Sequence, residues 1–300
     1  MTPSNPHGRR RLRRVWLSVK AAAAGLVFCV TAFGALSEAS AQTSAITPLP
    51  SPWDFAIGGK ITSDYNFRGI SQSARQPNLQ LYGELRYDWL YAGAWAYTTR
   101  LPSRPLAEID LYVGIRPKVG PVTLDLGAMY YLYPNERQFQ FPAGTIWTPS
   151  DTDFWEAYFR PRWEVNSTLT IGANTAYAPN WLRSGASGTI ATAVATVSLP
   201  NNFSISGEVG RYWFGRNLPI YGGIKLPDFT LWNVGLSYTW NQLTFDVRYH
   251  GTDASPERCF LLTSDQRGVT TGSGRSNWCG HAFIASVSFD TTWNTFKPIR

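Results

Sequence analysis

The sequence predicts an all-β protein, a transmembrane antiparallel β-barrel of about twelve strands with short periplasmic turns and long extracellular loops. Three observations predict this fold. Apolar and polar residues alternate with a period of two, the connections alternate in length, and charged residues keep to one parity of the alternation. Together they describe strands that separate an apolar medium from an aqueous one.

The alternation is clearest in NLQLYGELRYDW (78–89), where Leu81 and Leu85 point to one face and Glu84 and Arg86 to the other. The same pattern predicts strands at residues 53–66, 78–89, 91–100, 106–117, 121–133, 153–164, 168–178, 188–199, 202–213, 228–240, 242–250 and 281–290. Most of these strands have close to the length of about nine to eleven residues that a tilted strand needs to cross a bilayer. Strands of soluble sheets are usually about five or six residues long.

The connections between these strands alternate in length. Those after every second strand are tight, near Leu90 and at KVGP, VNST, LPNN and WNQ. The others are long: RGISQSARQP, LPSRPL, PNERQFQFPAGTIWTPSD, APNWLRSGASG, FGRNLPIYGGIKLP and residues 251–280. Short turns on one rim and long loops on the other are typical of outer-membrane barrels, whose short turns face the periplasm.

Charged residues lie almost entirely on the polar parity of the strands. The outward parity carries only Arg211, close to a loop end. A lipid-facing Arg or Lys at mid-bilayer costs about 2–4 kcal/mol, so we expect the polar parity to face a wet interior. The inward set has more carboxylates than cations, which predicts a weak cation preference: Lys60, Asp64, Glu84, Arg86, Asp88, Glu108, Asp110, Arg116, Asp125, Glu156, Arg160, Arg162, Glu164, Glu208, Asp246 and Arg248.

Aromatic residues gather at two levels, as in the interfacial girdles of membrane barrels. The level at the short turns is predicted to contain Trp53, Trp89, Tyr91, Trp163 and Trp240. The level at the long loops is predicted to contain Tyr65, Tyr97, Trp155, Tyr177 and Trp232. A soluble β-protein with an aromatic core is the alternative.

Residues 1–41 are predicted to be a cleaved secretory signal peptide. A cluster of arginines is followed by the apolar run AAAAGLVFCVTAFGAL and by Ala39-Ser40-Ala41. A short linker (42–52), the barrel (53–290) and a C-terminal tail or strand extension (291–300) are expected to follow. The chain is therefore expected in the outer membrane of a Gram-negative bacterium.

Cleavage at this point removes most of the basic excess. The segment holds six of the 27 basic residues and one of the 20 acidic residues, which leaves a net charge of +2. Nucleic-acid binding loses its main support, and no nucleic-acid partner is expected. Cys259 and Cys279 are the cysteines that remain, and two cysteines in an exported chain predict a disulfide, with two free thiols as the alternative.

Catalytic and metal-binding signals are weak. His250 and His281 flank the last long loop, and with Asp253 they allow a barrel hydrolase as an alternative. No GxSxG, HExxH or CxxC motif and no calcium-loop spacing is present, so we expect neither an enzyme nor a metal or cofactor. The inward charges instead predict a lumen that is lined by charge or partly filled by ion pairs across strands.

The stretch SDYNFRGISQS (63–73) is interpreted as the end of the first strand and the start of the first long loop. Tyr65 and Phe67 are expected to point outward, Asp64 into the lumen and Arg68 into it at the rim. This stretch resembles the opening motif of the TorF-type porins, a proteobacterial family. LYAGAWA, EIDLYVGI, GAMYYLYP, FWEAYFRP and WNVGLSYTWNQLTFDVRYHGTD follow in the matching order.

The resemblance implies an outer-membrane barrel with porin activity and brings no catalytic residues. The cysteine pair and the residues after Phe289 depart from the family pattern. We therefore expect a channel for passive diffusion of small hydrophilic solutes or ions, in contact with outer-membrane lipid and, through basic loop residues, with lipopolysaccharide. A non-conducting barrel with partner-binding loops is the remaining alternative, and the oligomeric state is left open. The candidate pore-lining residues are Asp64, Arg68, Glu84, Arg86, Glu108, Asp110, Glu156, Arg160, Arg162, Glu208, Asp246 and Arg248.

Overall fold

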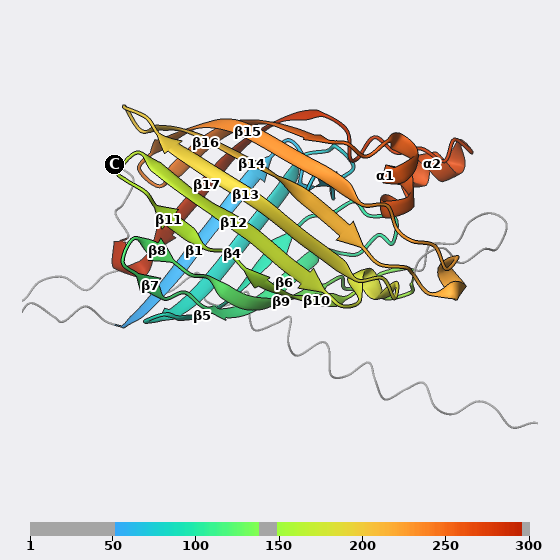
Figure 1. Ribbon diagram of the computed structural model, residues 1–300, viewed down its shortest axis with the longest axis horizontal. Coiled ribbons are helices and arrows are strands. Elements are labelled where there is room, and N and C mark those ends of the chain that lie inside the picture. Colours follow the sequence, from blue (N-terminus) through green and yellow to red (C-terminus); the bar gives the residue numbers. More distant parts are fainter. Residues whose placement is uncertain (1–51, 138–148, 296–300) are drawn as a thin grey trace, which may run out of the picture. The chain divides into compact units, whose positions relative to one another are not determined.

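The computed structural model of the chain describes residues 52–137 and 149–295. The predicted signal peptide, almost all of the linker and residues 296–300 lie outside this range. The described residues form a closed antiparallel barrel of twelve strands, so the predicted fold class is confirmed (Figure 1). The ring closes where β1 pairs with β17, with Lys60 opposite Ser288.

Strands that are neighbours in the barrel wall are also consecutive along the chain, apart from the closing pair of β1 and β17. They are β1 (Trp53–Thr62), β4 (Asn78–Tyr87), β5 (Leu90–Tyr97), β6 (Glu108–Ile115), β9 (Leu126–Leu132), β10 (Phe154–Phe159), β12 (Leu169–Ala178), β13 (Gly188–Ser198), β14 (Phe203–Phe214), β15 (Phe229–Trp240), β16 (Leu243–Thr252) and β17 (Ala282–Thr292). Each strand therefore lies where the alternation predicts one.

Two of the predicted strands are interrupted near the short-turn end. The fifth divides into β8 (Val122–Thr123) and β9, and β8 forms a small hairpin with β7 (Lys118–Val119). The sixth divides into β10 and β11 (Arg162–Glu164). Pro161 lies between β10 and β11, and proline interrupts a ladder because it has no N–H to donate.

The first and the last wall strand each end at a different residue from the one predicted. β1 ends at Thr62, four residues before its predicted end. β17 runs to Thr292, two residues beyond the predicted barrel, and a short 3-10 turn, η3 (Trp293–Thr295), follows it. The first difference matters most, because it frees the residues after Thr62 from the wall.

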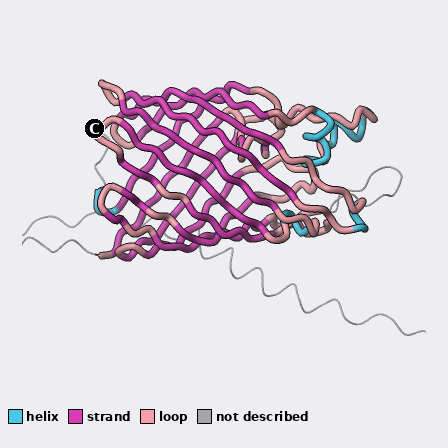
Figure 2. Tube along the Cα trace, in the orientation of Figure 1, coloured by secondary structure: helices cyan, strands magenta, loops and turns pink. Residues whose placement is uncertain are grey.

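Short turns and long loops lie at opposite ends of the barrel (Figures 1 and 2). The helices α1 (Pro256–Thr263) and α2 (Gln266–Thr270) and the 3-10 turns η1 (Trp181–Arg183) and η2 (Pro219–Tyr221) all belong to long loops. None of the helices in the described ranges is long and apolar enough to cross a membrane.

The outer surface of the wall is apolar. Leu81, Val113 and Val209 are each more than half exposed, although a soluble protein would bury such side chains. Of the aromatic residues expected on this surface, Trp53, Trp89, Trp155, Trp163, Tyr177 and Trp240 are exposed there.

Tyr91 and Tyr97 were expected on the outer surface and lie inside the barrel instead. Tyr91 is 4 % exposed, and its hydroxyl group lies 2.7 Å from that of Tyr158. Tyr97 stacks on Tyr65 in the interior. In β5 the outward positions hold the small residues Ala92, Ala94 and Ala96, so aromatic character alone pointed to the wrong face.

Val209 offers a test of the outer surface as a lipid-facing wall. It lies mid-strand in β14 and is 54 % exposed. Val209→Arg is expected to lower the free energy of unfolding in lipid vesicles by about 2–4 kcal/mol, because the guanidinium group enters hydrocarbon. Urea titration measures the loss, and Val209→Leu is the matched control. Equal stability of the two variants would contradict a lipid-facing wall.

Candidate functional site in the barrel interior

Residues 63–77, named here the plug hairpin, fold back into the barrel. Within them β2 (Asn66–Phe67) pairs with β3 (Ile70–Ser71) across a two-residue turn at Arg68 and Gly69. Both turn residues have positive φ, 52° and 86°, as the type I′ turn of a tight hairpin requires. The Asn66 side chain stabilises the turn, since its Oδ1 accepts a hydrogen bond from the Gly69 N–H at 3.0 Å.

The plug hairpin overturns the interpretation of SDYNFRGISQS as a strand end. Tyr65 and Phe67 do not face outward. Tyr65 is 6 % exposed, and Phe67 packs edge-on against Tyr131 of β9 in the interior. The alternation predicts a strand over residues 53–66, but the chain leaves the wall after Thr62, and beyond that residue parity no longer reports which face a side chain lies on.

Asp64 holds the base of the plug hairpin together. Its Oδ1 accepts hydrogen bonds from the hydroxyl groups of Ser71 at 2.5 Å and Ser73 at 2.9 Å. Its Oδ2 lies 3.1 Å from Arg75 Nη1 in an ion pair. Asp64 is therefore an internal scaffold of the hairpin, not a pore-lining residue of the wall.

Arg68, at the tip of the plug hairpin, forms a buried ion pair with Glu156 of β10. Its Nη2 lies 2.5 Å from Glu156 Oε1 and its Nη1 donates to Oε2 at 2.9 Å, a bidentate pair. The hydroxyl group of Tyr131 also donates to Glu156, and the Arg68 guanidinium lies 5.6 Å from the ring centre of Tyr212. Arg68 thus lies inside the lumen and not at the rim, where it was expected.

The plug hairpin crosses the lumen. Tyr65 stacks on Tyr97 of β5 with ring centres 4.6 Å apart and donates to Glu108 of β6 at 3.0 Å. Arg68 reaches β10 and β14, as described above. Gly69 lies so close to Leu231 of β15 and Thr252 of β16 that an added Cβ would approach them to 3.3 and 2.5 Å. One hairpin therefore contacts β5, β6 and β10 on one side of the ring and β14, β15 and β16 on the other.

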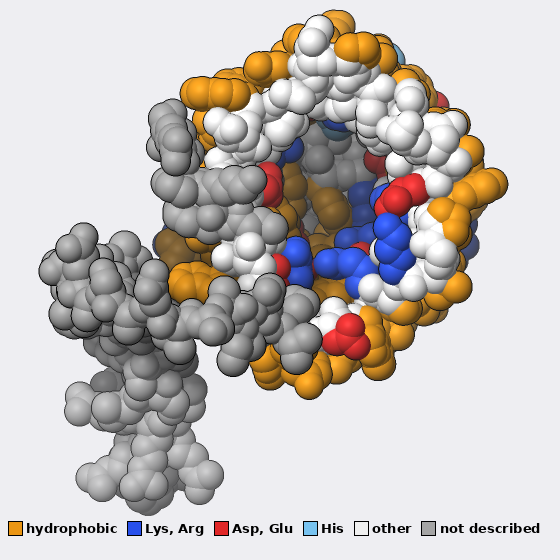
Figure 3. All heavy atoms as spheres, turned by 90° about the vertical axis from the view of Figure 1, so that its left-hand side faces the viewer, with side chains coloured by type: hydrophobic (Ala, Val, Ile, Leu, Met, Phe, Trp, Pro, Cys, Tyr) orange, Lys and Arg blue, Asp and Glu red, His pale blue; other side chains and the backbone are white. Residues whose placement is uncertain are grey.

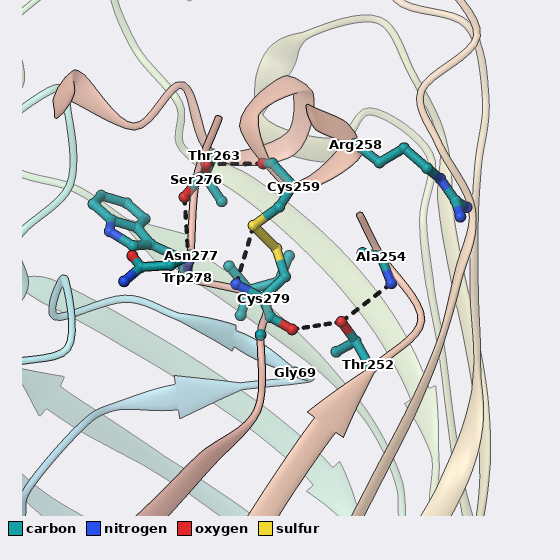
Figure 4. Close-up of a disulfide and its surroundings, with 12 residues drawn as sticks. Gly69, Thr252, Ala254, Arg258, Cys259, Thr263, Ser276, Asn277, Trp278 and Cys279 are labelled. Carbon is teal, nitrogen blue, oxygen red and sulfur yellow. Dashed lines mark hydrogen bonds between the residues drawn. A yellow bond between two sulfur atoms is a disulfide. The ribbon is translucent and has the colours of Figure 1, made fainter. Parts of the chain in front are cut away.

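A cap formed by residues 253–281 holds the plug hairpin from the long-loop side (Figure 4). Cys259 of α1 is bonded to Cys279 with an S–S distance of 2.03 Å, which confirms the predicted disulfide. The Ser71 N–H donates to the Trp278 carbonyl at 2.9 Å. The Arg75 guanidinium donates to the Gly280 carbonyl at 2.7 Å. The disulfide therefore fixes the segment on which the hairpin is anchored.

The interior on the short-turn side is named here the open half. Figure 3 views it end-on as a hollow lined by blue Lys and Arg and red Asp and Glu side chains, inside a rim of orange apolar side chains. Glu84 lies at its wall and pairs with Arg86 at 2.5 Å and with Arg116 at 3.1 Å. Arg116 continues to Asp125 at 3.4 Å. Both arginine side chains are about one-third exposed, so this ladder of charges meets solvent.

A second polar network lies across the open half. Arg248 pairs with Asp246 at 2.9 Å and donates to Asn233 Oδ1 at 2.8 Å. Asn233 in turn donates to Glu208, which also accepts from Thr192 at 2.5 Å. The chain of bonds joins β13, β14, β15 and β16 and holds the inward carboxylates in fixed positions.

Three inward cations have no carboxylate partner within ion-pair distance among the described residues. Arg160 lies over the ring of Tyr158 at 4.0 Å. Arg162 donates to the Ala173 carbonyl at 2.6 Å and to Asn174 Oδ1. Lys60 lies on the inward parity of β1, beside Gln80 of β4. The side chains of all three are partly exposed, and no carboxylate of the described residues neutralises them in an ion pair.

The structure sorts the twelve pore-lining candidates into three groups. Asp64 and Arg68 belong to the plug hairpin, and Glu108, Asp110 and Glu156 are almost completely buried beneath it. The candidates on the open half are Glu84, Arg86, Arg160, Arg162, Glu208, Asp246 and Arg248. The excess of carboxylates that predicted a cation preference therefore lies in the half of the lumen that the plug hairpin fills, named here the closed half, where these side chains are buried.

Sequence reasoning did not find two members of the open half. Asp290 lies on β17, and its Oδ1 accepts a hydrogen bond from the Tyr82 hydroxyl at 3.0 Å. Asp290 falls on the polar parity of the last strand and could have been found from the alternation alone. Tyr82 could not, because an aromatic side chain fits either face.

The residues of the hydrolase alternative do not converge. His250 lies on the inward parity of β16 with Asp246 and Arg248. His281 lies on the other face, stacked on Tyr249 and bonded to its hydroxyl group at 2.7 Å. Asp253 accepts a hydrogen bond from the Thr230 N–H at 2.7 Å and does not reach either histidine. The geometry gives no support to a His–Asp pair at this rim.

Several basic loop residues expected at a lipopolysaccharide-facing rim have partners within the protein. Lys225 pairs with Asp228 at 2.7 Å, and Arg275 pairs with Glu257 at 3.2 Å. Arg183 pairs with Asp151 at 2.8 Å. Asp151 also belongs to an acidic group whose ligand atoms lie within 4.8 Å of one another, the other members being Glu136 and Asp153.

The Arg68–Glu156 pair allows a direct test of the plug hairpin. Arg68→Met leaves Glu156 buried without a cation and is expected to cost about 3–5 kcal/mol of stability. Arg68→Met with Glu156→Gln removes the stranded charge and is expected to recover most of that loss. Urea titration of the detergent-solubilised barrel measures both. A double variant as unstable as the single one would contradict the pairing.

A family model described as "Bacterial protein of unknown function (Gcw_chp)" matches residues 47–281. No curated protein matches the sequence. Among solved structures, the KdgM porin shares 10% identity over 79% of this chain and 98% of its own, with a TM-score of 0.45. The toluene transporter TodX of Pseudomonas putida shares 10% over 81% and 89%, with a TM-score of 0.41. Likenesses this distant do not indicate a function for this chain. The resemblance to TorF-type porins stays a prediction.

Proposed function

The chain belongs to the Gcw_chp family of bacterial proteins of unknown function, and we propose that it forms a channel for passive diffusion of small hydrophilic solutes or ions across the outer membrane. The plug hairpin holds this channel nearly closed. The observation that carries the proposal is the contrast within one barrel, an apolar outer surface around an interior whose charged side chains remain partly exposed. A water-filled, charge-lined interior is what ion-conducting barrels require.

The location follows from the same surface. Exposed Trp53, Trp163 and Trp240 lie at the short-turn level, and exposed Trp155 and Tyr177 lie toward the long loops. Aromatic residues favour the two membrane interfaces, so these levels bracket the hydrocarbon. With the short turns facing the periplasm, the cap and the plug hairpin lie on the outer side. Export through a cleaved signal peptide and contact with lipopolysaccharide belong to the same proposal.

The charges of the open half favour small anions. Lys60, Arg160 and Arg162 lack a carboxylate partner among the described residues. Of the inward carboxylates described above, Glu84, Asp125 and Asp246 are paired with arginine, whereas Glu208 and Asp290 accept hydrogen bonds from neutral groups and keep their charge. Unpaired cations on a narrow wall raise the local potential that a passing ion meets. The preference proposed here is therefore opposite in sign to the one that the sequence predicted.

A non-conducting barrel is the second candidate, because the plug hairpin crosses the lumen. Replacing residues 66–71 by two glycines removes the hairpin tip, and planar-bilayer recordings are expected to show conductance steps several-fold larger than those of the unaltered protein. Replacing residues 219–224, in the long loop after β14, by two glycines is the matched control and is expected to leave the steps unchanged. A barrel that folds but passes no current in any of the three forms would exclude the channel.

The anion preference has its own test. Arg160→Gln with Arg162→Gln removes two cations from the open half, so the ratio of chloride to potassium permeability is expected to fall. Reversal potentials across a salt gradient measure this ratio. Arg104→Gln, an exposed loop arginine bonded to Gln266, is the control and is expected to leave it unchanged. A ratio unaffected by the interior variant would remove Arg160 and Arg162 from the ion path.

A further inference from the structure

Two carboxylates are buried next to each other beneath the plug hairpin. Glu108 and Asp110 lie two residues apart on β6, on the same inward face, and are 1 % and 2 % exposed. Alternate residues of a strand point to the same side, roughly 6.6 Å apart along the chain. Neither residue has an arginine, lysine or histidine within ion-pair distance among the described residues.

Each carboxylate is half satisfied. The Tyr65 hydroxyl donates to Glu108 Oε1 at 3.0 Å, and Tyr97 hydrogen-bonds to Asp110. The rings of the two tyrosines stack in parallel, with an angle of 2° between them. Glu108 Oε2 and Asp110 Oδ1 are buried and have no hydrogen-bond partner within residues 52–137 and 149–295. The two stacked tyrosines therefore each donate one hydrogen bond to one carboxylate, and one oxygen of each carboxylate is left without a donor.

The charge of this cluster is unbalanced. In their ionised forms Glu108, Asp110 and Glu156 carry three negative charges, against one positive charge on Arg68, which is engaged with Glu156. The other titratable groups near the cluster are tyrosines, namely Tyr65, Tyr97, Tyr131 and Tyr133. Buried charges are paired or coordinate metals, because an isolated ion loses its hydration without compensation.

We propose that Glu108 and Asp110 bind a divalent cation of the calcium type beneath the plug hairpin. The free oxygens Oε2 and Oδ1 would be its protein ligands, and one divalent ion would balance the two unmatched charges. Oxygen-only donors select a hard cation such as Ca²⁺ over Zn²⁺, which favours sulfur and nitrogen ligands.

Calcium is favoured over magnesium at this position. Mg²⁺ keeps several waters in a near-octahedral shell and sheds them reluctantly, whereas Ca²⁺ accepts irregular shells of carboxylate and carbonyl oxygens. Because Tyr65 bonds Glu108, a cation on Glu108 would also hold the hairpin against β6.

Calcium uptake tests the site on the whole protein. The chain is refolded in detergent without lipopolysaccharide, treated with EDTA, freed of chelator and dialysed against radioactive CaCl₂. About one equivalent of calcium per chain is expected, with weaker competition from MgCl₂ and none from equimolar NaCl. Glu108→Gln with Asp110→Asn is expected to abolish this uptake, and its fold is checked by the heat-dependent shift on gel electrophoresis.

Two controls separate this site from other carboxylates. Glu84→Gln alters an inward carboxylate that is already paired with two arginines and is expected to bind calcium normally. Asp151→Asn alters the acidic group at Glu136, Asp151 and Asp153 and is also expected to bind normally. Calcium should also slow hydrogen exchange of residues 63–77 in the unaltered protein only.

The proposal is overturned if the folded protein takes up no calcium, which would leave a proton shared by the two carboxylates as the balancing charge. It is equally overturned if uptake survives the Glu108 and Asp110 changes and is lost in the Asp151 variant. Neither outcome depends on conductance, so the site and the channel are judged separately.

Discussion

The closed half of the lumen depends on the charge of Arg68. Its guanidinium group satisfies Glu156, which is 0 % exposed, and packs near the ring of Tyr212, so the tip of a polar hairpin is held in the middle of an aromatic interior. Breaking one partner of such a pair is costly because the other charge stays buried. The ion pair thus couples the position of the first long loop to the opposite wall. As a result, the barrel interior is divided into the closed half, which the plug hairpin fills, and the open half.

Most of the wall could be predicted from the sequence, because lipid and water impose a strict alternation on every strand. The adjacent pairs Glu84-Leu85 and Glu208-Val209 each place one residue on the inner face and one on the outer face. The alternating connection lengths predicted the two ends of the barrel, and the two cysteines predicted the disulfide that the structure contains. The seven candidates on the open half were found in this way, since a charged residue in a membrane strand has only one acceptable side.

The closed half could not be predicted, for two physical reasons. Parity has meaning only while the chain remains in the wall, and nothing in the alternation marks that it leaves at Thr62. Aromatic residues such as Tyr91 and Tyr97 suit both the lipid interface and a packed interior, so their side depends on what fills the lumen. The Arg68-Gly69 pair carried a signal, because glycine in a two-residue turn favours a tight hairpin, but arginine is a weak former of such turns.

The position of the plug hairpin in the chain constrains the order of assembly. The hairpin follows the first wall strand, yet Gly69 rests against Thr252 of β16, and Arg68 bonds Glu156 and Tyr212, 88 and 144 residues further along. These surfaces exist only after the later strands have paired. The first long loop therefore cannot reach its final position until β10, β14 and β16 are in place, so its docking depends on contacts that are far apart in the chain.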